Sequence, residues 1–253
     1  MTLGWILAAS VAGGTLSAGL AAISLKVRAS WVPMLVSFAI GALLGAAFLE
    51  VIPHAFERGE PHQAAVAILG GIFVFFVMEK LLLWRHCHTE NCEVHDPHAA
   101  SHDRGRSGLL IVVGDTVHNF VDGLLIAAAF LQGTELGIIA AVAIIAHEIP
   151  QEVGDFLILL HSGYSRARAL AMNLLSSFAT VIGGVIGYFA LQLVADWEAT
   201  LLGVVAASMI YVAVADLIPG LHRQPELRDT ASQALLIALG IAAIAAVRAL
   251  VAH

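Results

Sequence analysis

The stretch AHEIPQEVGDF, from Ala146 to Phe156, places three acidic residues, a histidine and a proline inside a long hydrophobic run. The residues around it are almost all Ile, Val, Leu, Ala or Phe. On insertion scales, one Asp at the centre of a membrane helix costs about 2.5–3.5 kcal/mol. A membrane helix of this composition is therefore stable only if its polar side chains face other helices, water or a bound cation.

The composition of the whole chain fits a membrane setting. Of its 253 residues, 59% are hydrophobic and 12% are charged, and the mean hydropathy is +0.88. A soluble domain carries about 25% charged residues. The long apolar runs also differ from the alternating segments of an outer-membrane barrel. We predict an all-α polytopic membrane protein whose partners are the lipid bilayer and its cargo, with no nucleic acid.

Eight stretches are long and apolar enough to cross a membrane as helices, since one crossing needs about 20 apolar residues. They are residues 3–25, 32–56, 63–84, 109–131, 136–160, 167–194, 199–218 and 231–252. We expect a single transmembrane domain covering residues 1–253. Its spans should form a 3+2+3 inverted-repeat bundle with spans four and five in the centre.

The basic residues predict how this bundle is oriented. Ten of the twelve Lys and Arg residues fall in or beside alternate connections, and the exceptions are Arg58 and Arg248. The positive-inside rule makes the basic side cytoplasmic. Eight spans then leave both termini outside the cell, in a plasma membrane or a bacterial inner membrane.

The connection 85–108 is unusually rich in residues that bind metals. They are His86, Cys87, His88, Cys92, His95, His98 and His102. Their spacing matches no closed zinc fold, and a disulfide is not expected on the cytoplasmic side. One interpretation is a flexible loop that collects metal ions, and the other is a polar linker that binds them weakly without purpose.

Spans four and five each carry a polar stripe on one helical face. The stripe of span four holds Asp115, His118, Asn119 and Asp122; that of span five holds His147, Glu148, Gln151, Glu152 and Asp155. Neither span contains a Lys or Arg that could offset the acids. Imidazole, carboxylate and amide groups together are a ligand set for divalent transition metals. Span six also carries Asn173, Ser176 and Ser177, for which helix–helix hydrogen bonds are the simpler interpretation.

Spans two and seven share a short internal sequence repeat. Glu50-Val51-Ile52-Pro53 and Asp216-Leu217-Ile218-Pro219 share an acid, an isoleucine and a proline at the same spacing. The predicted topology runs these two spans in opposite directions, which is typical of the inverted repeats of secondary transporters. Glu50 and His54 should lie near the outer face and Asp216 near the inner face, as successive positions along a transport path.

These residues carry a resemblance to a known family. The sequences His118-Asn119-Phe120-Val121-Asp122-Gly123 and His147-Glu148-Ile149-Pro150-Gln151-Glu152 resemble the paired motifs of the ZIP (Zrt-, Irt-like protein) metal transporters, and Phe48–His54 adds support. The resemblance implies eight spans, outward termini, no catalytic cofactor and uptake of zinc, iron, manganese or related ions into the cytoplasm. It further implies a binuclear metal centre between spans four and five.

The resemblance also implies two ligand sets. One metal would use His118, Asp122, His147 and position 151. The second would use Asn119, Asp122, Glu148 and position 151, with Asp122 bridging. This chain departs from the pattern at Gln151, where the most similar branch has His, and Glu152 is a candidate replacement ligand. Glu50 stands where His is common, which makes the outer mouth more acidic.

The sequence leaves alternatives open. His147-Glu148 begins the zinc-protease pattern H-E-x-x-H, so an intramembrane metalloprotease is one, although Gln151 replaces the second histidine. A metal-sensing or structural membrane protein without flux is another. The nitrogen and oxygen donors argue against Cu(I); among the remaining ions zinc is favoured, with Fe(II), Mn, Co and Cd open. Whether the chain forms a homodimer is not decided.

Overall fold

The computed structural model describes residues 1–24, 32–86, 106–221 and 227–251, and every regular element in these ranges is helical. Eight helices are long and apolar enough to cross a membrane, as expected. Most are single elements: α1 (Thr2–Ser24), α4 (Pro61–His86), α5 (Arg106–Gln132), α6 (Thr134–His161), α7 (Arg166–Leu191) and α10 (Leu227–Val251). Two are composite: α2 (Val32–Ala46), η2 (Ala47–Val51) and α3 (Ile52–Glu57) form the second, and α8 (Glu198–Tyr211), η5 (Val212–Leu217) and α9 (Ile218–Leu221) the seventh.

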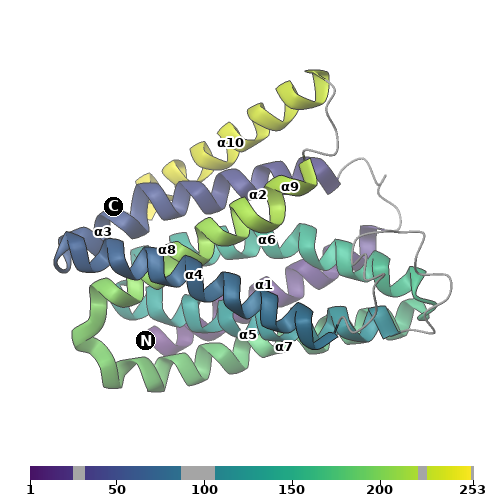
Figure 1. Ribbon diagram of the computed structural model, residues 1–253, viewed down its shortest axis with the longest axis horizontal. Helices are drawn as coiled ribbons and strands as arrows, with labels where there is room; N and C mark the ends of the chain where they lie inside the picture. Colours follow the sequence, from purple (N-terminus) through teal and green to yellow (C-terminus); the bar gives the residue numbers. More distant parts are fainter. Residues whose placement is uncertain (25–31, 87–105, 222–226, 252–253) are drawn as a thin grey trace.

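The helices run roughly along the long axis of the molecule, and both termini lie at its left-hand end in Figure 1. The tight connection at Gly133 and the short 3₁₀ helix η4 (Gln192–Trp197) lie at this end too. The turn from α6 to α7 lies at the other end and uses Gly163, whose φ of +89° is one that L side chains rarely adopt. An even number of spans thus brings both termini to one side.

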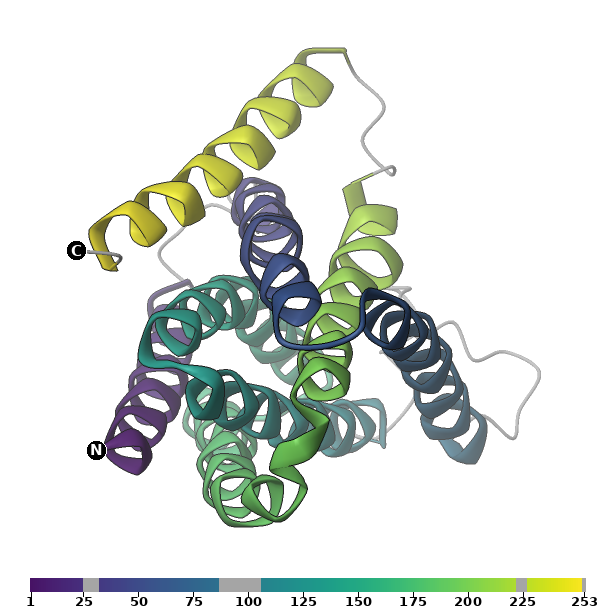
Figure 2. The ribbon, with the colours of Figure 1, turned by 90° about the vertical axis from the view of Figure 1, so that its left-hand side faces the viewer.

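The spans pack as two groups. In the first group α5 packs along α7 while α1 packs on α6 and α7, and in the second α10 packs on α2 while α4 packs on α8. The groups meet chiefly where α2 packs against α6, as the end-on view in Figure 2 shows. The two helices with the polar stripes, α5 and α6, therefore belong to the same group.

Glycines let two helix pairs approach closely. A Cβ placed on Gly123 of α5 would lie 2.1 Å from the carbonyl oxygen of Thr180 in α7. Between α2 and α10, a Cβ on Gly41 would lie 2.0 Å from the carbonyl oxygen of Ile237. Small residues allow such backbone contact inside membranes. The polar stripe of α5 is consequently held against α7.

The short internal sequence repeat of spans two and seven has a structural counterpart. Both copies lie where an α-helix widens into a π-helix, η2 in one and η5 in the other. The N–H of Ile52 donates to the carbonyl of Ala47, and the N–H of Ile218 donates to the carbonyl of Ala213. The two segments thus share one local distortion ahead of a proline, while the inverted repeat of whole spans stays a prediction.

Candidate metal centre

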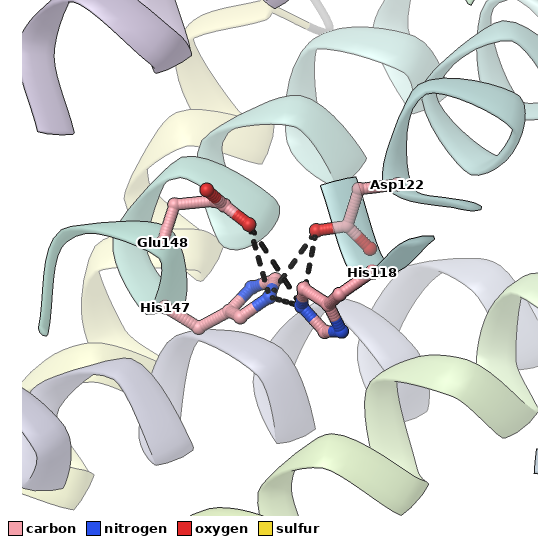
Figure 3. A group of neighbouring side chains, drawn as sticks. All are labelled: His118, Asp122, His147 and Glu148. Carbon is pink, nitrogen blue, oxygen red and sulfur yellow. Dashed lines mark hydrogen bonds and ion pairs between the residues drawn. The ribbon is translucent and has the colours of Figure 1, made fainter. Parts of the chain in front are cut away.

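Four predicted site residues come together between α5 and α6. His118 and Asp122 are one turn apart on α5, and His147 and Glu148 are neighbours on α6. Figure 3 shows the two imidazoles and two carboxylates converging on one small space. We call these four residues the central cluster. Both histidines lie close to the midpoints of helices that are long and apolar enough to cross a membrane, and charge is most costly at the centre of such a span.

The spacing of the central cluster suits one metal ion. Five separations between its nitrogen and oxygen atoms range from 3.1 Å, for the two Nε2 atoms, to 3.9 Å, for His147 and Glu148. All four candidate ligand atoms lie within 4.8 Å of one another. Two atoms bound to one zinc ion at about 2.1 Å lie no more than about 4.2 Å apart. Small side-chain movements would therefore bring all four onto a single ion.

The charges of the central cluster lack a fixed counter-ion. Among the described residues, its ion pairs join only its own histidines and carboxylates, and none involves Lys or Arg. Asp122 Oδ2 and Glu148 Oε1 are buried and have no hydrogen-bond partner among the residues that the structure describes, although both face the imidazoles. An unsatisfied buried polar group costs about 1–3 kcal/mol, and more when it is charged. A bound cation would offset that cost.

Three further predicted residues form a hydrogen-bonded layer beside the cluster. The side-chain amide of Asn119 donates to Asp115 Oδ1 at 3.0 Å, and that of Gln151 donates to the same oxygen at 3.3 Å. Asn119 Oδ1 accepts a hydrogen bond from Thr180 at 2.8 Å. Both amides implied as ligands of a second metal are thus engaged with Asp115 and Thr180, and would have to exchange these partners to bind an ion.

Helix α7 holds Glu152 in place. Ser177 donates to Glu152 Oε1 at 2.6 Å, and the Asn173 amide donates to the Glu152 carbonyl oxygen at 2.9 Å. Both contacts are the helix–helix hydrogen bonds expected for span six. Ser176 instead donates to carbonyls of its own helix. Glu152 Oε2 is buried without a hydrogen-bond partner, so this carboxylate is only half satisfied.

Sequence reasoning missed Thr180. Its one available signal was position: it lies three residues after Ser177 and seven after Asn173, so it continues their helical face. A threonine within an apolar run attracts no attention by itself, because its hydroxyl often bonds to its own helix. Here the hydroxyl reaches Asn119 of α5, which the close approach at Gly123 makes possible.

Glu50, which was predicted to lie near the outer face, has a partner that the sequence did not indicate. Glu50 is buried, and its Oε1 lies 3.0 Å from Arg248 Nε of α10. His54 is half-buried, and its Nδ1 lies 2.8 Å from the Glu50 carbonyl oxygen. A guanidinium therefore accompanies the acid, while the more acidic outer mouth stays a prediction.

The other residues predicted along the path lie outside the central cluster. Asp155 is half-buried on α6, and Asp216 is exposed in η5. His86 is the last residue of α4. The remaining residues proposed to capture metal, Cys87, His88, Cys92, His95, His98 and His102, lie outside the described residues.

Comparison with known proteins finds similarity to zinc transporters. A family model described as the ZIP zinc transporter matches residues 2–107 and 84–248. The Drosophila melanogaster protein named zinc transporter ZIP13 homolog is 28% identical over 277 residues, covering 87% of this chain and 78% of that protein. Mouse zinc transporter ZIP4 is 32% identical over 249 residues, covering 73% and 37%. Zinc transporter ZIP13 of Pongo abelii is 31% identical over 229 residues, covering 82% and 64%. The chain thus spans less than two thirds of the last two relatives' own length.

Proposed function

This chain belongs to the ZIP zinc transporter family, and from that premise we propose that it moves divalent metal ions, zinc above all, across a membrane into the cytoplasm. The observation that carries the proposal is the central cluster. Two imidazoles and two carboxylates meet near the midpoints of two helices that are long and apolar enough to cross a membrane, without a Lys or Arg partner among the described residues. Such a group is unfavourable in a bilayer unless a cation visits it.

The chemistry of the cluster supports zinc as cargo. Imidazole nitrogen and carboxylate oxygen are common zinc ligands, and four of them match the usual coordination number. The same ligands also accept Fe(II), Mn, Co and Cd, so preference must be measured. A transported ion needs sites that it can leave again. The neutral Gln151, in place of the family's usual histidine, would help release.

The direction of transport rests on charge and topology. A hydrated ion would approach past Glu50 and His54, exchange water for the central cluster, and leave along Glu152, Asp115 and Asp155. Asp216 and the histidine-rich loop would receive it on the basic side, which we take as cytoplasmic by the positive-inside rule. Both termini would then face outward, in a plasma membrane or a bacterial inner membrane.

Orientation can be tested by labelling. In a background with Cys87→Ser and Cys92→Ser, an impermeant thiol reagent applied to intact cells should label Arg58→Cys. It should leave Arg104→Cys unlabelled until the cells are opened. The reverse pattern would contradict inward transport.

The metalloprotease is the weaker alternative. A zinc protease of the H-E-x-x-H type needs a second histidine ligand four residues after His147, and Gln151 stands there. Its amide is hydrogen-bonded to Asp115. Glu148, which would be the general base, instead joins the ligand cluster. A metal sensor without flux would share the whole arrangement, so only transport itself separates it from a transporter.

The decisive experiment is uptake into proteoliposomes. Zinc accumulation should be measured alone and in competition with Fe(II), Mn, Co and Cd, beside a peptide-cleavage assay on the same preparation. Asp122→Asn is the matched control, because it keeps the side-chain shape and removes the charge. Accumulation that this variant loses supports the proposal. Zinc binding without accumulation would make the protein a sensor, and peptide cleavage would make it a protease.

A further inference from the structure

The contact between Glu50 and Arg248 joins a buried acid to a partly exposed base. Only 1% of the Glu50 side chain is exposed, against 56% of the Arg248 side chain. Neither oxygen of Glu50 has a hydrogen-bond partner, so within the described residues the guanidinium at 3.0 Å is its main compensation. A burial this unequal leaves the arginine free to withdraw while the acid stays inside.

Packing fixes where Arg248 can reach. The Cβ of Ile244 would lie 3.4 Å from a Cβ placed on Gly45 of α2. Arg248 follows Ile244 by one turn of α10, and Glu50 lies five residues beyond Gly45. The close contact between Gly41 and Ile237 anchors the same pair of helices. The close α2–α10 contact therefore brings Arg248 beside Glu50.

The form of the ion pair suits exchange. A strong arginine–carboxylate pair is bidentate, with two parallel N–H···O bonds. Here the guanidinium contacts Glu50 Oε1 through Nε, without the alignment of a hydrogen bond. When the arginine leaves, the buried carboxylate needs another positive charge in its place. An arriving divalent cation supplies one.

We infer that Arg248 is a tethered counter-ion for Glu50, which occupies the outer carboxylate between transport events and sets the affinity with which the mouth captures a divalent cation. This inference rests on the proposed function. Arg248 acts through Glu50, so it is a positioning residue and does not itself touch the cargo. Its positive charge also lowers the local concentration of cations at the mouth.

The test is zinc uptake by proteoliposomes as a function of zinc concentration. Arg248→Gln should lower the concentration for half-maximal uptake by about threefold, the scale of a partly exposed ion pair, and change the maximal rate less. Arg248→Lys keeps the charge and should stay near wild type. Arg58→Gln is the matched control, because Arg58 also lies at the outer end and pairs with an exposed glutamate, Glu198, at 3.4 Å. It should leave uptake unchanged.

A second comparison uses the Glu50→Gln background to ask whether Arg248 acts through Glu50. Glu50→Gln should raise the half-maximal concentration, and adding Arg248→Gln to it should lower that concentration by less than in the wild-type background, because the acid through which Arg248 acts is gone. An unchanged half-maximal concentration for Arg248→Gln, or an equally large effect of Arg248→Gln with and without Glu50, would overturn the inference alone. Absence of uptake by the wild-type protein would instead overturn the proposed function.

Discussion

The central cluster and the Glu50–Arg248 pair are two buried acidic regions with opposite solutions to the same electrostatic problem. Glu50 has an arginine from a distant helix at 3.0 Å. Within the part of the chain that the structure describes, Asp122 and Glu148 pair only with two histidines, whose charge depends on protonation, and each keeps an oxygen without a hydrogen-bond partner. A counter-ion supplied by the chain itself keeps a region stable while no cation is bound. Its absence marks the place that a cation must complete.

The most severe test of this comparison removes Asp122. Asp122→Ala should nearly abolish transport, because both imidazoles lie within 3.6 Å of this carboxylate. Loss of a partner outside the first ligand shell already costs about 10–100-fold in metal affinity, so loss of this ligand should cost more. Zinc titration and uptake measure the effect. Asp229→Ala, in the first turn of α10, is the control, and equal loss there would point to general damage.

Added zinc should stabilise the folded protein through the central cluster. A ligand at 100 times its dissociation constant adds about 2.7 kcal/mol to the free energy of unfolding. Thermal unfolding in detergent should therefore shift upward with zinc in the wild type, and the shift should vanish in Asp122→Asn. Glu50→Gln should retain it. A zinc response that depended on Glu50 and not on Asp122 would reverse the roles of the two regions.

Changing Gln151 should alter metal preference more than stability. Gln151→His replaces an amide with an imidazole, which suits zinc better than manganese. We expect zinc to bind about tenfold tighter, in line with one added ligand interaction of about 1.4 kcal/mol, with slower turnover because release is harder. Competitive titration of zinc and manganese against both forms measures this. Unchanged preference would exclude position 151 from the site.

The smallest effect should come from the layer behind the cluster. Thr180→Val removes the hydroxyl that donates to Asn119 at 2.8 Å and leaves the side-chain shape nearly unchanged. The loss of one such hydrogen bond costs about 1 kcal/mol of stability. Zinc affinity should change by only a few fold. Thermal unfolding together with zinc titration checks both quantities, and a loss of binding as large as that of Asp122→Ala would make Asn119 a first ligand.

The predictable part of this molecule is the part that a bilayer dictates. Acids such as Asp122 and Glu148 cannot face lipid, so their helical spacing alone predicts that α5 and α6 turn these faces inward. Contacts between helices that are distant in the chain were harder to predict from the sequence. Nothing near Arg248 in the sequence points to Glu50, 198 residues earlier.

The direction in which a side chain points was also not predictable from the sequence. Gln151 and Asn119 lie on the predicted faces, but their amides turn to Asp115, a choice that depends on rotamers and on α7. Spacing along one helix cannot reveal it.

The paired π-helical segments have a consequence for how the chain tolerates change. A π-bulge accommodates one extra residue in a helix, and one residue corresponds to about 100° of rotation. Each segment therefore changes the rotation about the helix axis between two parts of one span. One part packs on neighbouring helices, and the other carries Glu50 or Asp216. Deleting one residue from η2 would leave Gly41 and Gly45 packed against α10 and turn the following part of the span by about 100°, so that Glu50 would lose its alignment with Arg248. The bulges thus allow the packing face of a helix and the direction of its acidic side chain to change independently of each other.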